Sequence, residues 1–213
     1  MSAKPMSPLR RLLSPSFALA ALSLACAAHA DYVWLERDAG GVASAHVGEL
    51  GKTPQAASSV AAPRAFLADG KDLPLTLEPA RMRIPAAAAG DLRLVASRVT
   101  DKGVLHYYQA RSGRAETRAL NDLELVPTEP GGNTFRLVWK GGIVAATQVN
   151  VETSAGWRRV LAPAQDGSVH LDTPFPGLYV LEVTAKVNGA VTVEGKRYED
   201  VRHTATLSFE VRP

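Results

Sequence analysis

Residues 178–187 read LYVLEVTAKV, and this stretch decides the fold class. Its apolar and polar side chains alternate with a period of two residues, as they do when successive side chains point to opposite faces of a strand. An antiparallel sheet with one buried and one wet face produces this pattern. One face would hold Tyr179, Leu181, Val183, Ala185 and Val187, and the other Val180, Glu182, Thr184 and Lys186.

The same alternation recurs along the chain, and helical periodicity is almost absent after residue 30. An alanine run at residues 86–89 is a weak helical signal. Further strands are expected at residues 32–36, 42–47, 92–96, 104–109, 134–140, 144–152 and 204–211. The sequence therefore predicts an all-β fold of antiparallel sheets packed face to face.

Turn-forming residues separate these strands and suggest a boundary. Clusters of Gly, Pro, Asn and Asp stand at residues 130–133, 141–142, 166–167 and 188–189. The stretch 127–133 is the clearest boundary, so we expect two antiparallel β-sandwich lobes, residues 31–128 and 132–213. One larger sandwich is the alternative, because residues 32–36 could pair with the second half.

The first thirty residues have the composition of a cleaved signal peptide. Lys4, Arg10 and Arg11 precede a nearly continuous apolar run at residues 16–28, and Ala28-His29-Ala30 supplies a small-x-small cleavage site. Cleavage after Ala30 and cleavage after Ala28 are both compatible with this pattern. The apolar run is shorter than the roughly 20 residues of a membrane-spanning helix. We therefore expect export, with no membrane span after cleavage.

Removing this segment changes the charge balance. The whole chain has 24 Lys and Arg against 21 Asp and Glu, and the first thirty residues hold three bases and no acid. The remainder is therefore formally neutral, which argues against nucleic acid as a partner.

Cysteine chemistry is confined to the signal segment. Cys26 is the only cysteine, so the processed chain would have no disulfide, thiolate ligand or cysteine nucleophile. Lipid anchoring through Cys26 is disfavoured because the bulky Leu24 stands where lipoprotein signals carry a smaller residue.

The second half resembles a known secreted module. Gly141-Gly142 leads into the strand at residues 144–152, followed by Gly156-Trp157, Asp166-Gly167 and the corner Pro176-Gly177-Leu178-Tyr179. This order resembles the transthyretin-like or carboxypeptidase-regulatory-like sandwich, a non-catalytic module. The resemblance implies immunoglobulin-like or transthyretin-like lobes, with Tyr179 pointing inward from a central strand.

Three further stretches resemble one bacterial family. They are residues 31–36 (DYVWLE), residues 106–114 (HYYQARSGR) leading to 122–127 (DLELVP), and residues 195–198 (GKRY). Together they resemble periplasmic proteins of unknown function that are described as nickel or cobalt uptake accessory proteins. The resemblance implies a periplasmic location, a divalent transition metal and a membrane or outer-membrane metal transporter as partner.

Without cysteine, a metal site would be built from histidine and carboxylate ligands, which suit nickel, cobalt, copper or zinc. The candidate ligands are His46, His106 and His203. His106 lies in a segment rich in Tyr and Arg, whereas His203 shares the phase of the apolar residues in its strand and can equally be a hydrogen-bonded histidine at the edge of the core. An amino-terminal His29, left by cleavage after Ala28, could also chelate a metal.

No catalytic motif accompanies these residues. The chain has no Gly-x-Ser-x-Gly elbow, phosphate-binding glycine loop or His-Glu-x-x-His helix, so we expect no enzyme. The alternative to metal uptake is an interaction or scaffold module of the cell envelope that binds no metal. A carbohydrate-binding sandwich, using Trp34, Trp139 and Trp157, is a further alternative.

Overall fold

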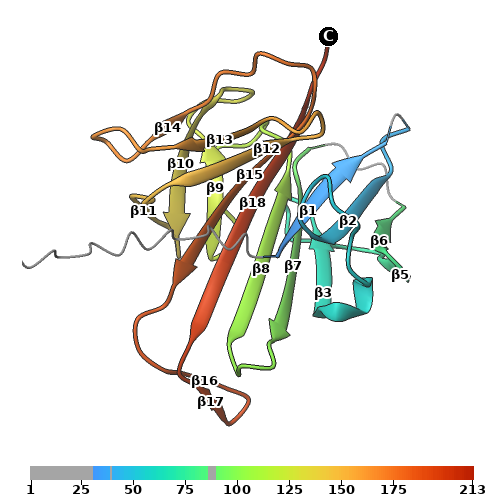
Figure 1. Ribbon diagram of the computed structural model, residues 1–213, viewed down its shortest axis with the longest axis vertical. Coiled ribbons are helices and arrows are strands. Elements are labelled where there is room, and N and C mark those ends of the chain that lie inside the picture. Colours follow the sequence, from blue (N-terminus) through green and yellow to red (C-terminus); the bar gives the residue numbers. More distant parts are fainter. Residues whose placement is uncertain (1–30, 39, 86–89) are drawn as a thin grey trace, which may run out of the picture.

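The computed structural model describes residues 31–38, 40–85 and 90–213, and they form an all-β fold, as the sequence predicts (Figure 1). Apart from strands, these residues contain one short 3-10 helix, η1 (Ala57–Ser59). The predicted signal peptide at residues 1–30, with Cys26 and His29, lies outside the described residues. The alanine run at residues 86–89 lies outside them too.

A large central sheet runs through the molecule. Its eight strands lie in the spatial order β13 (Arg158–Leu161), β12 (Val149–Thr153), β15 (Gly177–Lys186), β18 (Val201–Val211), β8 (Leu105–Ser112), β7 (Leu92–Val99), β3 (Ala61–Phe66) and β4 (Asp72–Leu73). Strands β18 and β8 pair in parallel, and the other neighbours in this sheet are antiparallel.

Two small antiparallel sheets pack on the central sheet. The first has the order β1 (Tyr32–Arg37), β2 (Ala43–Gly48), β6 (Arg81–Ile84) and β5 (Thr76–Glu78). In the second, β10 (Thr134–Trp139) pairs with β11 (Gly142–Val144), β14 (Val169–His170) and β9 (Leu123–Pro127). A ribbon of β16 (Val191–Val193) and β17 (Lys196–Tyr198) projects from the end of the body (Figure 1).

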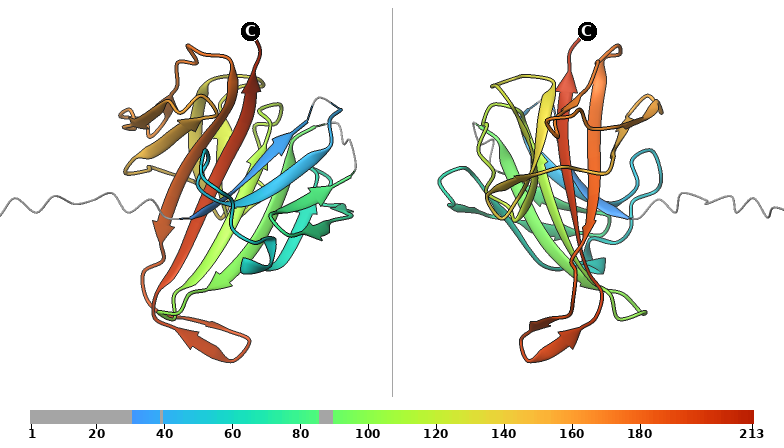
Figure 2. Two further views of the ribbon diagram at one scale, coloured as in Figure 1. Left: turned by 45° about the vertical axis from the view of Figure 1, so that its right-hand side comes forward. Right: turned by 90° about the vertical axis from the view of Figure 1, so that its left-hand side faces the viewer.

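The two small sheets cover opposite faces of the central sheet (Figure 2). Along β18, Ala205, Leu207 and Phe209 belong to the core beneath β9 and β10. The alternate residues Thr206 and Ser208 donate hydrogen bonds to carbonyl oxygens of β1. Because successive side chains of a strand point to opposite faces, we call these the β10 face and the β1 face.

The two predicted lobes share the central sheet. The expected boundary at residues 127–133 falls between β9 and β10, which pair with each other. Strand β8 of the first lobe lies beside β18 of the second over eight register positions, from Leu105–Val201 to Ser112–Ser208. Strands from both predicted lobes therefore belong to one continuous sheet.

The strand expected at residues 144–152 is interrupted, which corrects the prediction. Strand β11 ends at Val144 and pairs with β10, whereas β12 begins at Val149 and pairs with β15 in the central sheet. Residues 145–148 carry the chain from one layer to the other. The alternation of side chains continues through residues 145–148, so the sequence predicted one strand where the structure has two.

The corner before β15 points Tyr179 inward, as the alternation predicts. Tyr179 is fully buried in the core on the β10 face. Its hydroxyl donates to the carbonyl oxygen of Phe175 at 2.9 Å and accepts the Phe175 N–H at 3.1 Å. These two bonds fasten the turn onto the strand that follows it.

Candidate functional site

The structure does not bring the three predicted metal ligands together. His106 stacks on Tyr108 and bonds Thr204 on the β1 face, whereas His203 contacts Tyr107 and Trp139 on the β10 face. His46 lies on β2, stacked on Trp34, and its Nε2 is 2.9 Å from the Glu36 carboxylate. Within residues 31–38, 40–85 and 90–213, no group of three His, Asp, Glu or Cys side chains could hold a metal ion.

Two of these histidines are buried and neutral. Burial, followed by the positive charge of Arg202, lowers the pKa of His106 to about 4. Burial also lowers the pKa of His203 to about 4, against the opposing effect of Asp122. A buried imidazole without a carboxylate partner disfavours its charged form, so both side chains act as neutral hydrogen-bonding groups near pH 7.

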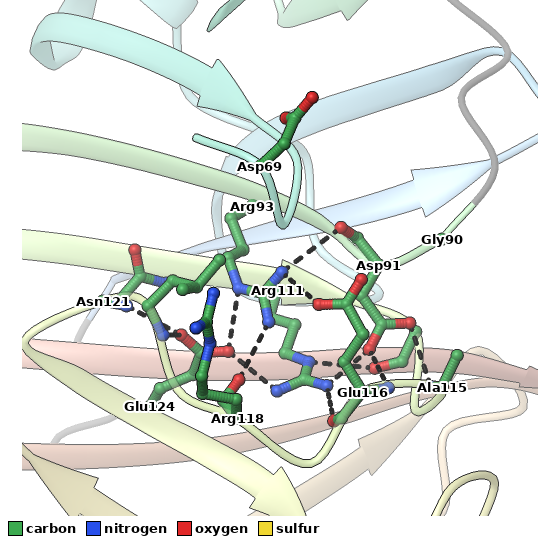
Figure 3. Close-up of polar contacts among 12 residues, drawn as sticks. Asp69, Gly90, Asp91, Arg93, Arg111, Ala115, Glu116, Arg118, Asn121 and Glu124 are labelled. Carbon is green, nitrogen blue, oxygen red and sulfur yellow. Dashed lines mark hydrogen bonds and ion pairs between the residues drawn. The ribbon is translucent and has the colours of Figure 1, made fainter. Parts of the chain in front are cut away.

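A buried ionic cluster occupies the β10 face of β7 and β8 (Figure 3). The guanidinium groups of Arg93 and Arg111, both fully buried, bond the same oxygen of Glu124 at 3.0 and 2.8 Å. Arg111 also pairs with Asp91, and Arg93 with Glu116 at 2.8 Å. Each of the two buried guanidinium groups therefore has carboxylate partners, as a buried charge requires.

The same carboxylates fasten the connection between β8 and β9. Asp91 accepts the N–H groups of Ala115 and Glu116, at 3.0 and 2.9 Å, and Glu124 accepts those of residues 120 and 121, at 2.9 and 2.8 Å. Gly113 adopts φ of 112°, and a Cβ there would overlap the Asp91 carboxylate. All these oxygens are engaged within the protein, so this cluster holds a loop in place and is not a ligand site.

The part of the β1 face that its small sheet leaves uncovered forms a groove. Strand β1 is the edge of that sheet and packs over β8 and β18, so the outer strands β12 and β13 stay open on this face. The groove has a volume of about 570 Å³, within the range of small-molecule sites. Its lining comprises Tyr32, Thr147, Gln148, Asn150, Val151, Glu152, Arg158, Arg159, Val160, Val180, Glu182, Val183, Thr184 and Arg202.

Glu182 lies at the centre of a hydrogen-bonded series that crosses the groove. Its carboxylate accepts from Asn150 Nδ2 at 2.7 Å and from Thr184 Oγ1 at 2.6 Å. Thr184 Oγ1 lies 2.6 Å from Thr204 Oγ1, which lies 2.7 Å from His106 Nε2. The series therefore joins a half-buried carboxylate in the groove to a buried imidazole.

The direction of these bonds follows from proton counting. A hydroxyl has one proton to donate, and the proton of Thr184 goes to the Glu182 carboxylate. Thr204 must then donate to Thr184 and accept from His106, which places the imidazole proton on Nε2. Every neighbour of Glu182 in the series is thus a donor directed toward the carboxylate.

Glu152, at the other end of the groove, already has a cation as its partner. Tyr32 donates its hydroxyl proton to Glu152 at 2.5 Å, and Arg158 forms an ion pair with the same carboxylate. Burial and this bond to Glu152 raise the pKa of Tyr32 well above its ordinary value. The two groove carboxylates therefore differ, because Glu152 has a cation partner and Glu182 has neutral donors.

The sequence singled out none of these groove residues as a site. Glu182 and Thr184 appeared only as the wet face of residues 178–187, and that assignment is correct. A lone sequence does not reveal that β1 stops short of this face. The nearest signal was the run of hydrogen-bonding side chains at alternate positions, Gln148 and Asn150.

A comparison of the chain with models of known protein families and with curated proteins finds no match. The resemblance to periplasmic metal-uptake accessory proteins therefore stays a prediction. Among the described residues, no helix has the length and apolar character needed to cross a membrane.

Proposed function

We propose that this protein is a non-enzymatic binding module of the cell envelope and that the groove on the β1 face is its binding surface. The observation that carries the proposal is the groove itself, whose floor holds the ordered polar side chains of Asn150, Glu182 and Thr184. Pre-oriented polar groups in a concave site are what fix a ligand's position.

Direct capture of a transition metal has less support. The three histidines that motivated it lie apart and are engaged in stacking or in hydrogen bonds to neighbouring side chains. The Trp side chains proposed to stack on sugars instead pack against other side chains of the protein. Trp34 is buried against His46, and Trp157 and Trp139 pack against the core on the β10 face. The groove supports a binding role without requiring either group.

The experiment compares two exposed apolar residues. Val160 at the groove and Ile143 on β11 are both 59% exposed, so Val160→Trp and Ile143→Trp introduce the same bulk at sites that tolerate it. Calorimetric titration with tripeptides and trisaccharides should detect binding with Kd of about 1 mM or tighter. Val160→Trp should abolish that binding, and Ile143→Trp should retain it. Equal binding by both variants, or no binding of any probe, would contradict the proposal.

A further inference from the structure

The groove contains a carboxylate without a cation. Among the residues that the structure describes, no Lys, Arg or His forms an ion pair with Glu182, whose contacts are the neutral donors of Asn150 and Thr184. We propose that the groove binds short peptides, with Glu182 receiving the ligand's ammonium group. This inference rests on the proposed function, because it names a ligand class for the same groove.

The capacity of Glu182 is only partly used. An ionised carboxylate offers about four acceptor positions, and Asn150 and Thr184 each fill one. Asn150 Nδ2 gives one of its two protons to Glu182, and Asn150 Oδ1 accepts from Gln148 Nε2 at 3.1 Å. Glu182 therefore has acceptor positions to spare, and a primary ammonium group supplies three donors with the matching charge.

The series that ends at His106 fixes the carboxylate in advance. Thr184 is held by Thr204, and Thr204 by the Nε2–H of a histidine that is 6% exposed. A ligand does not have to order these groups on binding, which reduces the entropic cost of association. Reorientation of Glu182 toward another partner would break the bonds made to it by Asn150 of the neighbouring strand β12 and by Thr184 of its own strand.

The test varies the two ends of one peptide. Trialanine, N-acetyl-trialanine and trialanine amide are titrated into the purified protein, and Kd is measured by calorimetry and by NMR shifts of the groove residues. Trialanine should bind; N-acetylation should weaken binding at least about tenfold, whereas amidation, which keeps the ammonium group, should have no comparable effect. Glu182→Gln should reproduce the effect of N-acetylation.

A matched control and a neutral probe complete the design. Asp101→Asn removes an exposed carboxylate from the turn after β7 and should leave Kd unchanged. Equal affinity for trialanine and N-acetyl-trialanine would overturn the peptide proposal. A neutral trisaccharide that shifts the groove residues when trialanine does not would overturn it too, while leaving the groove as a binding surface. If no probe shifts these residues, both proposals fail.

Discussion

At the scale of single residues, the two buried histidines make stability depend on pH. In the unfolded chain a histidine has a pKa of about 6.5, whereas burial lowers the pKa of His106 and of His203 to about 4 in the folded protein. The unfolded state therefore binds more protons between these values, and the free energy of unfolding should fall as pH decreases from about 6.5 to about 4. Each histidine should contribute about 1–3 kcal/mol to this loss.

Urea unfolding at a series of pH values measures this effect. His106→Gln and His203→Gln should each reduce the slope between about pH 6.5 and pH 4. The control, His170→Gln, changes an exposed imidazole and should keep the wild-type slope. A slope unchanged by the first two variants would show that other groups cause the pH dependence.

The buried arginines give a second prediction at this scale. Arg111→Met leaves Asp91 and Glu124 short of a partner in a fully buried site, and breaking a buried ion pair costs about 3–5 kcal/mol. Arg64→Met removes an exposed pair with Asp72 and should cost about 1 kcal/mol or less. Chemical denaturation compares the two, and similar losses would contradict the structural role of the cluster.

Sequence reasoning reached these residues only in part. The phase of His203 with Ala205 and Leu207 correctly predicted a hydrogen-bonded histidine at the core, where it bonds Gln109 at 3.2 Å. No burial was predicted for Arg93 and Arg111, because arginine is almost never fully buried unless it is paired. Their burial depends on Asp91, Glu116 and Glu124, which come from three separate segments. A single sequence does not reveal that these segments are in contact.

At the scale of elements, β1 is held to the central sheet by side-chain donors. Thr206 Oγ1 donates to the carbonyl oxygen of Val33 at 2.6 Å, and Ser208 Oγ to that of Leu35 at 2.5 Å. Thr206→Val and Ser208→Ala leave these buried carbonyl groups without a donor, which should cost about 1–3 kcal/mol each. Thr192→Val, on the exposed ribbon, should be near neutral by thermal unfolding, and equal shifts in all three variants would contradict this role.

The positions of the strands were predictable from the two-residue alternation and the turn residues between them. The expected strands at residues 92–96 and 104–109 match β7 (Leu92–Val99) and β8 (Leu105–Ser112). Pairing was less accessible, since the parallel contact of β8 with β18 joins segments about a hundred residues apart. Alternation marks which side of a strand is buried but does not specify the neighbouring strand.

At the scale of the whole molecule, the shared central sheet predicts a single unfolding transition. Strands of both predicted lobes are hydrogen-bonded neighbours at β8 and β18, so one lobe cannot unfold without exposing the edge of the other. Differential scanning calorimetry should give one peak whose calorimetric and van't Hoff enthalpies agree. Two separable peaks would instead indicate lobes that fold independently.

The groove is also a property of the whole molecule, because three separate segments form it. Tyr32 comes from β1, Asn150 from β12 and Glu182 from β15. The sequence predicted the wet face of β15 that holds Glu182, but the opening between β1 and β12 depends on how the small sheet is placed over the large one. That placement is set by packing in two cores on opposite faces, which periodicity does not describe.

The most direct measurement of the central claim uses the side-chain amide of Asn150, which donates to Glu182 in the groove floor. In the ¹⁵N-labelled protein, the Asn150 amide signals are followed during titration with trialanine and with a neutral trisaccharide. The account predicts saturable shifts of these signals in wild type that are lost in Val160→Trp. Signals that do not move with either probe, or that move equally in Val160→Trp, would contradict it.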